Sequence, residues 1–371
     1  MALKFWITLT LVALLICLSY HGIEGRTVST REEDHELEEQ LNILNKPAIK
    51  SFEDEIGDMF DCIDINKQPA FDHPLLKDHK IQMKPTMIPE GVVSQTSSQR
   101  KRLVIMPKGI DCPEGTVPIR RTQKEDLLRA KSFMESSSIH TLNNDSPGQY
   151  SATFQSSTGG ETRYYGAQAN MNVINPRVAD DQASLALIWL RSATDDNVIQ
   201  AGWAGAKPGC FNLHCSGFVR VDWKNSIDTV FDKTSVYDYQ QLEMQLRVIQ
   251  DQRKNWWVQI PDFNISFGYW PGSLFQGLAD GASQVGFGGI TRGSVDGINP
   301  VMGFGTFPPV NAKRCGYFRQ MKIVNKDNQL TRLVGDWKEN TDSPKCYGVK
   351  SYGYRKDNGD IIEYGGPGGR C

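Results

Sequence analysis

The sequence predicts an all-β fold, an antiparallel β-sandwich, preceded by a small and partly helical N-terminal segment. From about Gln149 onward, short runs of β-branched, aromatic and alternating apolar residues are bounded by Gly, Pro, Asn or Asp. The 371 residues also include 34 glycines and 18 prolines, which favour tight turns and short strands over long helices. The strands expected most clearly are Tyr150–Phe154, Arg163–Ala167, Met171–Ile174, Leu185–Leu190 and Trp256–Ile260.

Residues 1–25 have the organisation of a secretory signal peptide. Lys4 precedes an apolar run from Phe5 to Leu18, which is followed by small residues such as Gly22 and Gly25. A run of about 14 residues is too short to cross about 30 Å of hydrocarbon. We therefore expect a secreted protein that is extracellular or bound in a cell wall, without a membrane anchor.

Composition and charge exclude two classes of partner. The net charge is −2, with 23% charged and 39% hydrophobic residues, so no field of one sign would recruit nucleic acid or an anionic membrane. We therefore expect no nucleic-acid and no membrane partner. The sequence says nothing about the oligomeric state.

The segment from residue 26 to about 140 contains helical patterns. Within Arg31–Leu44, leucines recur at helical spacing, and Asn45–Pro47 ends the pattern. A second short helix is expected after Ser51, because Phe52, Ile56 and Phe60 would share one helix face. A third is expected to start where Thr122 and Glu125 have the spacing of a capping box, before Leu127, Leu128 and Phe133.

Several motifs, taken together and in order, resemble the neprosin family of plant proteins. Two of them resemble the signatures of its activation peptide, and five resemble parts of the neprosin domain. These motifs are Asp61–Lys77 and Cys112–Thr122, and then Tyr164–Pro176, Ala201–Trp203, Asn212–Phe218, Gly268–Phe275 and Tyr364–Cys371.

The resemblance implies an organisation and a chemistry. Residues 26–140 would be an inhibitory, removable prosegment, and residues 141–371 a β-sandwich with glutamic-peptidase activity at proline. Such a peptidase uses two glutamates in a groove across one sheet. One is ionised and takes a proton from the attacking water, while the other is protonated and donates to the carbonyl oxygen or the leaving amine. The resemblance implies no metal and no cofactor.

The sequence departs from this pattern at both catalytic positions. The first glutamate would stand directly before Ala201–Trp203, where this chain has Gln200. The second would follow a Gly-Gly pair, best matched by Gly288–Gly289, and this position is occupied by Ile290. A glutamine amide can hydrogen-bond water but cannot exchange a proton as a carboxyl group does, and isoleucine can do neither. Asp296 is the substitute carboxylate that we consider, as a partner for Gln200.

The connection after Trp203 is a second departure. The family carries a strand-rich stretch before its Cys-Asn-Leu segment, whereas this chain reaches Cys210 seven residues after Trp203. Two interpretations stay open. Either the groove has been remodelled beside the first catalytic position, or the sequence as given lacks an exon.

The cysteines are expected to form disulfides, because the secretory route is oxidising. The resemblance implies the pairs Cys210–Cys215 and Cys346–Cys371, and it allows Cys62 and Cys112 to pair within the prosegment signatures. Cys315 would then be the odd thiol. Its neighbours Lys313 and Arg314 could favour the thiolate, while the alternative is an inert, half-buried cysteine. A zinc site at Cys210, His214 and Cys215 is disfavoured, because it would lack a fourth ligand.

Aromatic residues suggest what a groove could bind. Trp203, Tyr269 and Trp270 lie in the family motifs, and aromatic faces suit proline-rich peptides and glycans. The alternative is that these residues fill the core. Asn264 begins a glycosylation sequon.

These observations predict a secreted neprosin-like protein that is a catalytically impaired glutamic-peptidase homologue. Its groove would still bind a ligand, either a peptide, with proline-rich peptides included, or a cell-wall glycan. The alternative is an active proline-directed endopeptidase with a displaced catalytic pair or an incomplete sequence. A wall-associated structural role is a third reading.

Overall fold

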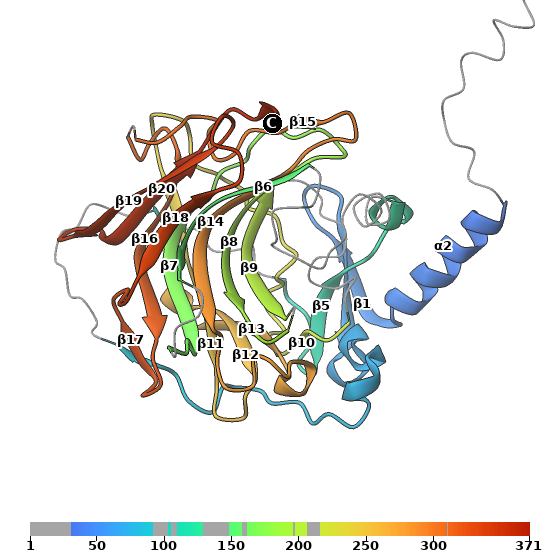
Figure 1. Ribbon diagram of the computed structural model, residues 1–371. Coiled ribbons are helices and arrows are strands. Elements are labelled where there is room, and N and C mark those ends of the chain that lie inside the picture. Colours follow the sequence, from blue (N-terminus) through green and yellow to red (C-terminus); the bar gives the residue numbers. More distant parts are fainter. Residues whose placement is uncertain are drawn as a thin grey trace, which may run out of the picture. The chain divides into compact units, whose positions relative to one another are not determined.

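A computed structural model describes residues 31–91, 103–104, 110–128, 148–157, 162–195, 197–205, 216–309 and 311–371 (Figure 1). Contacts divide the chain into two compact units, Met1–Ile43 and Leu44–Cys371. The first helix expected from the leucine spacing is confirmed as α2 (Arg31–Leu44). No helix in the described residues is long and apolar enough to cross a membrane.

The second predicted helix is wrong, and a β-hairpin stands in its place. Strands β1 (Ala48–Glu53) and β2 (Met59–Asp64) are antiparallel, and β2 also pairs with β5 (Thr116–Arg120). Phe52 lies directly opposite Phe60 across the hairpin. The two aromatic residues therefore meet as a cross-strand pair, and their eight-residue spacing fits this arrangement as well as a helix face.

Short helices follow the hairpin and the third strand. The 3₁₀ helices η1 (Ile65–Lys67), η2 (Pro69–Asp72) and η3 (Pro74–Leu76) lead from β2, and η2 and η3 each begin with a proline. The third predicted helix is present at residues 124–128. Its start is fixed by Asp126, whose Oδ2 accepts a hydrogen bond of 2.9 Å from the backbone N of Gln123.

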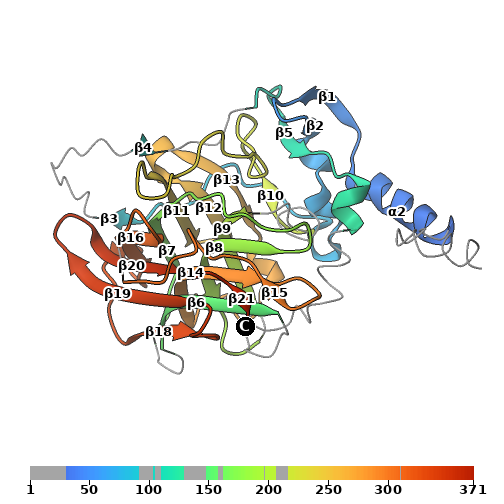
Figure 2. The same cartoon turned by 90° about the horizontal axis from the view of Figure 1, so that it is seen from above.

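A five-stranded antiparallel sheet forms one layer of the sandwich (Figures 1 and 2). Its strands, in spatial order, are β18 (Trp337–Thr341), β6 (Gln149–Ser156), β14 (Gln284–Arg292), β8 (Ala183–Arg191) and β9 (Val198–Gly205). β8 is almost wholly buried along its length. Its continuous apolar run Leu185–Leu190 suits a strand that has both a neighbour on each side and cover on each face.

An eleven-stranded sheet forms the second layer. The main path is β10 (Val219–Arg220), β13 (Ile265–Trp270), β12 (Trp256–Ile260), β11 (Leu242–Gln250), β7 (Gly166–Asn172), β16 (Gly316–Val324), β17 (Gln329–Thr331) and β3 (Glu90–Gly91). Beside this path lie β20 (Gly359–Gly365), β19 (Gly348–Arg355) and β4 (Leu103–Val104). A separate pair joins β15 (Ile298–Asn299) to β21 (Gly369–Arg370), and η4 (Pro261–Phe263) and η5 (Gly272–Leu274) flank β13.

The predicted all-β class is confirmed, and one pair of predicted strands is corrected. Arg163–Ala167 and Met171–Ile174 are not two strands, because β7 runs without a break from Gly166 to Asn172. Ala167, Ala169 and Met171 face the core, while Gln168 and Asn170 alternate with them on the other face. Gln168 and Asn170, which lie between or beside the two predicted strands, are therefore part of the normal alternation of one continuous strand.

Both layers share one hydrophobic core. Ala186 and Ile188 of β8 and Phe287 of β14 pack in the same cluster as Met244 and Leu246 of β11. The pairing within each layer is antiparallel except where residues from the expected prosegment join. There, β3 pairs in parallel with β17, and β4 pairs in parallel with β11. Residues before position 140 thus contribute two strands to the larger sheet.

Candidate functional site

Gln200 and Ile290 lie on the same face of the five-stranded sheet. Gln200 on β9 pairs with Trp189 of β8, and Ile290 on β14 pairs with Leu185 of the same strand. Trp189 and Leu185 are four residues apart, so their side chains leave β8 on one side. This side faces away from the shared core, and we call it the outer face.

The two positions are too far apart for direct contact. One strand separates them, and they are offset by four residues along it. On a flat sheet with strands about 4.8 Å apart and a rise of about 3.3 Å per residue, their Cα atoms would be about 16 Å apart. Side chains at these positions would therefore have to act on a ligand lying between them.

Ile290 is embedded in an apolar cluster on the outer face. Leu185, Leu187 and Ile290 are each 5% exposed, and Ala183 and Ala204 pack with them. A charged group would lose most of its hydration here. The position at which the resemblance implies a carboxyl group is therefore occupied by, and surrounded by, aliphatic side chains.

On the outer face, Gly286 lies level with Gln200 and leaves the space above β14 free of a side chain. Trp189 is buried, and a β-carbon on Gly286 would lie 2.3 Å from its indole ring. The glycine thus allows the indole to lie across β14. Gly202 and Gly288, both paired with Leu187, further reduce the side-chain cover between Gln200 and Ile290.

One carboxylate beside the strand that pairs with Ile290, Asp342, is engaged by Ser151. Asp342 accepts hydrogen bonds of 2.7 Å from both the backbone N and Oγ of Ser151, the residue of β6 that pairs with Ile290. No motif in the sequence pointed to Asp342. Two further strands, β14 and β8, separate β6 from Gln200 on β9.

Asp296 is not brought to Gln200. It lies in an exposed turn after β14 has ended at Arg292, and its Oδ1 accepts the backbone N of Ile298 at 3.0 Å. Gln200 lies level with Gly286, and β14 continues from there to Arg292. At a rise of about 3.3 Å per residue, the end of β14 is already about 20 Å from Gln200 along the strand direction, and Asp296 lies beyond it.

The predicted groove aromatics lie away from the outer face. Trp203 is three residues from Gln200, so it leaves β9 on the opposite side, into the shared core. Its Nε1 donates a hydrogen bond of 2.9 Å to the backbone O of Asn172. Trp270 is half-buried and packs edge-on against Phe218, with ring centroids 4.7 Å apart.

A cavity of about 860 Å³ opens where β9 forms the edge of its sheet. Gln200 and Trp203 line it from the two sides of β9, and Trp270 lines it from β13. Its apolar wall comes mainly from the inner faces of the larger sheet, with Met244, Leu246, Val258 and Phe267.

The opposite wall of the cavity is charged and comes from residues before position 140. Arg120 forms ion pairs of 3.0 Å with Asp58 and 2.9 Å with Asp126. Burial disfavours the charge of Arg120, but the hydrogen bonds to Asp58 and Asp126 outweigh burial and raise the pKa of Arg120. The sequence did not reveal this cluster, because its members come from a hairpin, a strand and a helix that meet only in the fold.

Tyr269 does not line the cavity, since it is wholly buried against the expected prosegment. Its hydroxyl oxygen accepts a hydrogen bond of 2.9 Å from the backbone N of Gln82 and lies 2.8 Å from Nε2 of His79. Burial raises the pKa of Tyr269 to about 12, so its hydroxyl stays protonated. Burial also lowers the pKa of His79, which favours the neutral imidazole.

This contact predicts a pH dependence of stability. The pKa of His79 is lowered on folding, so the unfolded chain takes up a proton first and stability falls as the pH drops below about 6.5. Replacing His79 by glutamine keeps an acceptor but removes the titration. The loss of stability between pH 7 and pH 5, measured by urea unfolding, should be smaller in His79→Gln than in the wild type. Equal losses would contradict this role.

Asp251 forms a second set of hydrogen bonds between the expected prosegment and the sandwich. Its Oδ2 accepts hydrogen bonds from Nε2 of Gln82 at 2.6 Å, the backbone N of Thr86 at 3.2 Å and Nε1 of Trp257 at 3.1 Å. Asn255 donates to Oε1 of Gln82 at 2.8 Å. These contacts fix residues 82–86 on the turn between β11 and β12.

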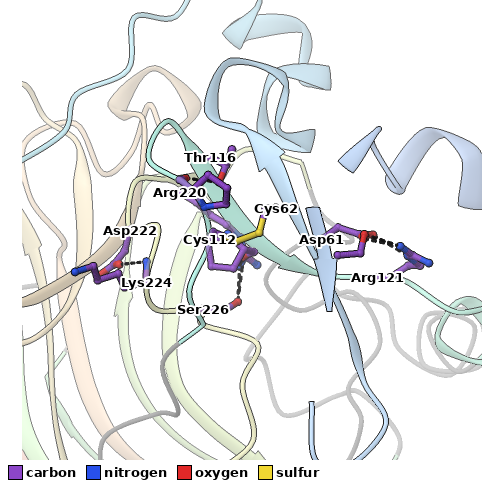
Figure 3. Close-up of a disulfide and its surroundings, with 12 residues drawn as sticks. Asp61, Cys62, Cys112, Thr116, Arg121, Arg220, Asp222, Lys224 and Ser226 are labelled. Atoms are coloured by element: carbon purple, nitrogen blue, oxygen red, sulfur yellow. Dashed lines mark hydrogen bonds and ion pairs between the residues drawn. A yellow bond between two sulfur atoms is a disulfide. The ribbon is translucent and has the colours of Figure 1, made fainter. Parts of the chain in front are cut away.

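A third set of hydrogen bonds between the expected prosegment and the sandwich lies around the Cys62–Cys112 disulfide (Figure 3). The amide of Gln68 exchanges hydrogen bonds with the backbone of Arg220, accepting from its N at 2.7 Å and donating to its O at 3.1 Å. The guanidinium of Arg220 donates to the backbone O of Pro118 and Oγ of Ser226, and pairs with Asp228.

Two disulfides are present in the described residues, Cys62–Cys112 and Cys346–Cys371. Cys315 is free and buried, and burial together with the charge of Glu363 raises the pKa of its thiol. Arg314 pairs with Asp238 at 2.6 Å. The surroundings of Cys315 therefore favour the thiol over the thiolate.

The last two predicted sites are the cysteine pair around His214 and the glycosylation sequon. Cys210, His214 and Cys215 lie outside the described residues. Asn264 is exposed between η4 and β13, in a left-handed conformation with φ of 54°.

Comparison with protein families gives two matches. Residues 50–164 match the neprosin activation peptide, and residues 204–367 match the neprosin domain. The first match extends past residue 140 through β6 of the five-stranded sheet. The second contains Ile290, the Gly268–Phe275 motif and the first half of the closing Tyr364–Cys371 motif. With both segments in family order, and with the β-rich fold that the motifs implied, the chain belongs to the neprosin family.

Proposed function

We propose that this chain is a secreted neprosin-family protein in which peptide-bond hydrolysis is impaired, and that its outer face retains a peptide or a cell-wall glycan. Proline-rich peptides are included among the ligands. The observation that carries the proposal is the aliphatic cluster at Ile290, on the same face as Gln200.

The chemistry of the two residues explains the impairment. Peptide hydrolysis needs one group to take a proton from water and another to donate one. General acid or base catalysis by one group contributes about 10²–10⁴-fold in rate. Gln200 can orient a water molecule, but neither it nor Ile290 exchanges a proton at ordinary pH. Since such groups act as a unit, losing both leaves little activity above the uncatalysed rate.

The geometry gives little support to a displaced catalytic pair. Asp296 lies in a turn beyond the end of β14, and Asp342 is held by Ser151. Asp58 and Asp126 share the cavity with Gln200, but both are paired with Arg120. None of these carboxylates combines proximity to Gln200 with freedom from a basic partner or a backbone donor.

Secretion is supported by three observations. Residues 1–25 have the pattern of a signal peptide, two disulfides are formed, and the sequon at Asn264 is exposed.

A peptidase assay tests the proposal. Full-length protein and protein with the prosegment cleaved would be incubated with a proline-containing fluorogenic peptide at acidic pH. We expect no turnover above a heat-denatured control, together with saturable binding of an uncleavable peptide of the same sequence or of a cell-wall oligosaccharide. Robust turnover would overturn the proposal. In that case Asp342→Asn, Asp296→Asn and Gln200→Ala would show which residues carry the activity, and sequencing the transcript across codons 203–210 would test for a missing exon.

A further inference from the structure

We propose that Arg247, in the middle of the eleven-stranded sheet, anchors a binding site for the carboxylate group of an acidic sugar. This inference goes beyond the proposed function. Arg247 lies on β11, in the other layer of the sandwich from Gln200 and Ile290, so the site shares no residue with the outer face.

A row of polar side chains crosses five neighbouring strands of the eleven-stranded sheet. Residues that pair directly across antiparallel strands project from the same side of a sheet. This side is turned away from the core, because the residues that alternate with the row, such as Leu246, Val248 and Val258, belong to the core cluster. From β13 to β16, the polar row consists of Ser266, Gln259, Arg247, Gln168 and Lys322.

Arg247 is a buried cation without an acidic partner in the described part of the chain. It is 8% exposed, and its guanidinium makes one hydrogen bond there, from Nε to Oε1 of Gln259 at 3.0 Å. Gln259 is oriented in turn by donating from Nε2 to Oγ of Ser266 at 2.7 Å. Burial lowers the pKa of Arg247 to about 10, so the guanidinium is still charged at neutral pH. Since buried charges in proteins are normally paired, its two terminal nitrogens are available to an anion from outside the chain.

Glu243, four residues before Arg247 on the same side of β11, is engaged by other groups. It pairs with Arg319 at 2.5 Å and accepts a hydrogen bond of 2.7 Å from the hydroxyl of Tyr317. At a rise of about 3.3 Å per residue, Glu243 is about 13 Å from Arg247 along the strand. The charge of Glu243 is therefore balanced by Arg319 and leaves that of Arg247 unbalanced.

Two glutamines supply polar groups on either side of the guanidinium. Gln168 pairs directly with Arg247, is 7% exposed, and its amide makes no hydrogen bond to another described residue. This amide can donate to a carboxylate that the guanidinium holds. Gln245, two residues before Arg247, donates from Nε2 to Oδ1 of Asn170 at 3.0 Å, and its carbonyl oxygen can accept from a hydroxyl group.

The charge and the polarity of the row point to an acidic sugar. One unbalanced cation matches a monovalent anion, whereas a phosphate dianion would keep one uncompensated charge in a buried place. The amides around Arg247 suit the hydroxyl groups of a sugar better than the side chains of an apolar peptide. A carboxylate on a sugar ring, as in a uronic acid, meets both conditions.

Titration calorimetry on the full-length chain with matched ligands tests this assignment. Galacturonate and galactose differ by the carboxylate at carbon 6. We expect galacturonate to bind with one site per chain, at least about 10-fold more tightly than galactose or inorganic phosphate. Binding of galactose or phosphate that is as tight as that of galacturonate would overturn the assignment, and so would the absence of galacturonate binding.

Two arginines supply a matched pair of variants. Arg247→Gln removes the charge and should weaken galacturonate binding at least about 10-fold. Arg355 is exposed at the end of β19, outside the polar row, and Arg355→Gln should leave the affinity unchanged. Gln168→Leu keeps a similar volume without the amide and should weaken binding about 5-fold. Unchanged affinity in Arg247→Gln would place the ligand elsewhere and overturn the assignment.

Melting temperatures distinguish an open site from a charge that is paired within the chain. Because the guanidinium has no acidic partner among the described residues, ligand-free Arg247→Gln should melt no lower than the wild type. Galacturonate should raise the melting temperature of the wild type and leave that of Arg247→Gln unchanged. A large fall in the melting temperature of the ligand-free variant would show an internal partner for Arg247 and would overturn the assignment.

The same variant separates this proposal from the proposed function. Peptide or glycan binding to the outer face should be unaffected by Arg247→Gln. Turnover of the fluorogenic peptide would overturn the proposed function and leave the galacturonate results standing. Failure of galacturonate binding would overturn the site at Arg247 alone.

Discussion

Replacing Asp251 by alanine is expected to lower the free energy of unfolding by about 4 kcal/mol. Asp251 is 4% exposed, and its two oxygens accept five hydrogen bonds. Alanine would leave the donors of Gln82 and Trp257 without an acceptor in a buried position, whereas Thr86 is exposed and its N–H can bond to water. Each unsatisfied buried donor costs about 1–3 kcal/mol, and part of this is recovered where water can enter.

Urea unfolding measures this effect, and Asp280→Ala serves as the control. Asp280 pairs with Lys254 at 3.0 Å on the surface, so its removal should leave the urea midpoint unchanged. Similar midpoints for Asp251→Ala and the wild type would mean that Asp251 does not fix the expected prosegment on the sandwich.

Introducing the missing carboxyl group as Ile290→Glu is expected to destabilise the fold by about 3 kcal/mol at pH 7. Ile290 lies among Leu185 and Leu187 at 5% exposure, so burial should raise the pKa of the new carboxyl group above its unfolded value of about 4.3. As the pH rises from about 4.3 to the folded pKa, the unfolded chain loses its proton while the folded chain keeps it. The destabilisation relative to the wild type should therefore be smaller at pH 4 than at pH 7.

Ile290→Gln is the matched control for this titration. Glutamine has nearly the same size and does not ionise, so its destabilisation should be the same at both pH values. Arg292 lies two residues further on the same face, and could pair with the new carboxylate. Equal stability of Ile290→Glu and Ile290→Gln at pH 7 would show that such a pair forms, and would contradict the expected penalty.

The sequence predicted the sandwich because its strands carry their own signals. β8 and β12 could be located from continuous apolar or aromatic runs that end at turn residues. The hairpin of β1 and β2 was missed because Phe52, Ile56 and Phe60 repeat every four residues, which also fits one face of a helix. The contact between Phe52 and Phe60 depends on the turn at residues 54–58, and the helical spacing concealed it.

The candidate site was predictable only in part. Family motifs located Gln200 and Ile290, and strand register then placed them on one face. Trp203 was expected in the groove beside Gln200. It is three residues from Gln200 along β9, so its side chain leaves the strand on the opposite face and enters the core. The cluster of Asp58, Arg120 and Asp126 joins residues up to 68 positions apart, and no local pattern marks contacts of this kind.

The Cys62–Cys112 disulfide limits what a protease can release. Arg100–Arg102 is a basic cluster of the kind that processing enzymes cut, and it lies between these two cysteines in the sequence. A cut there would produce two polypeptides that remain joined through the cystine. They would migrate as one band on a non-reducing gel and as two bands after reduction. Shedding the N-terminal piece would require a second cut after Cys112 or reduction of the bond, so a nicked protein would retain every residue of the charged cavity wall.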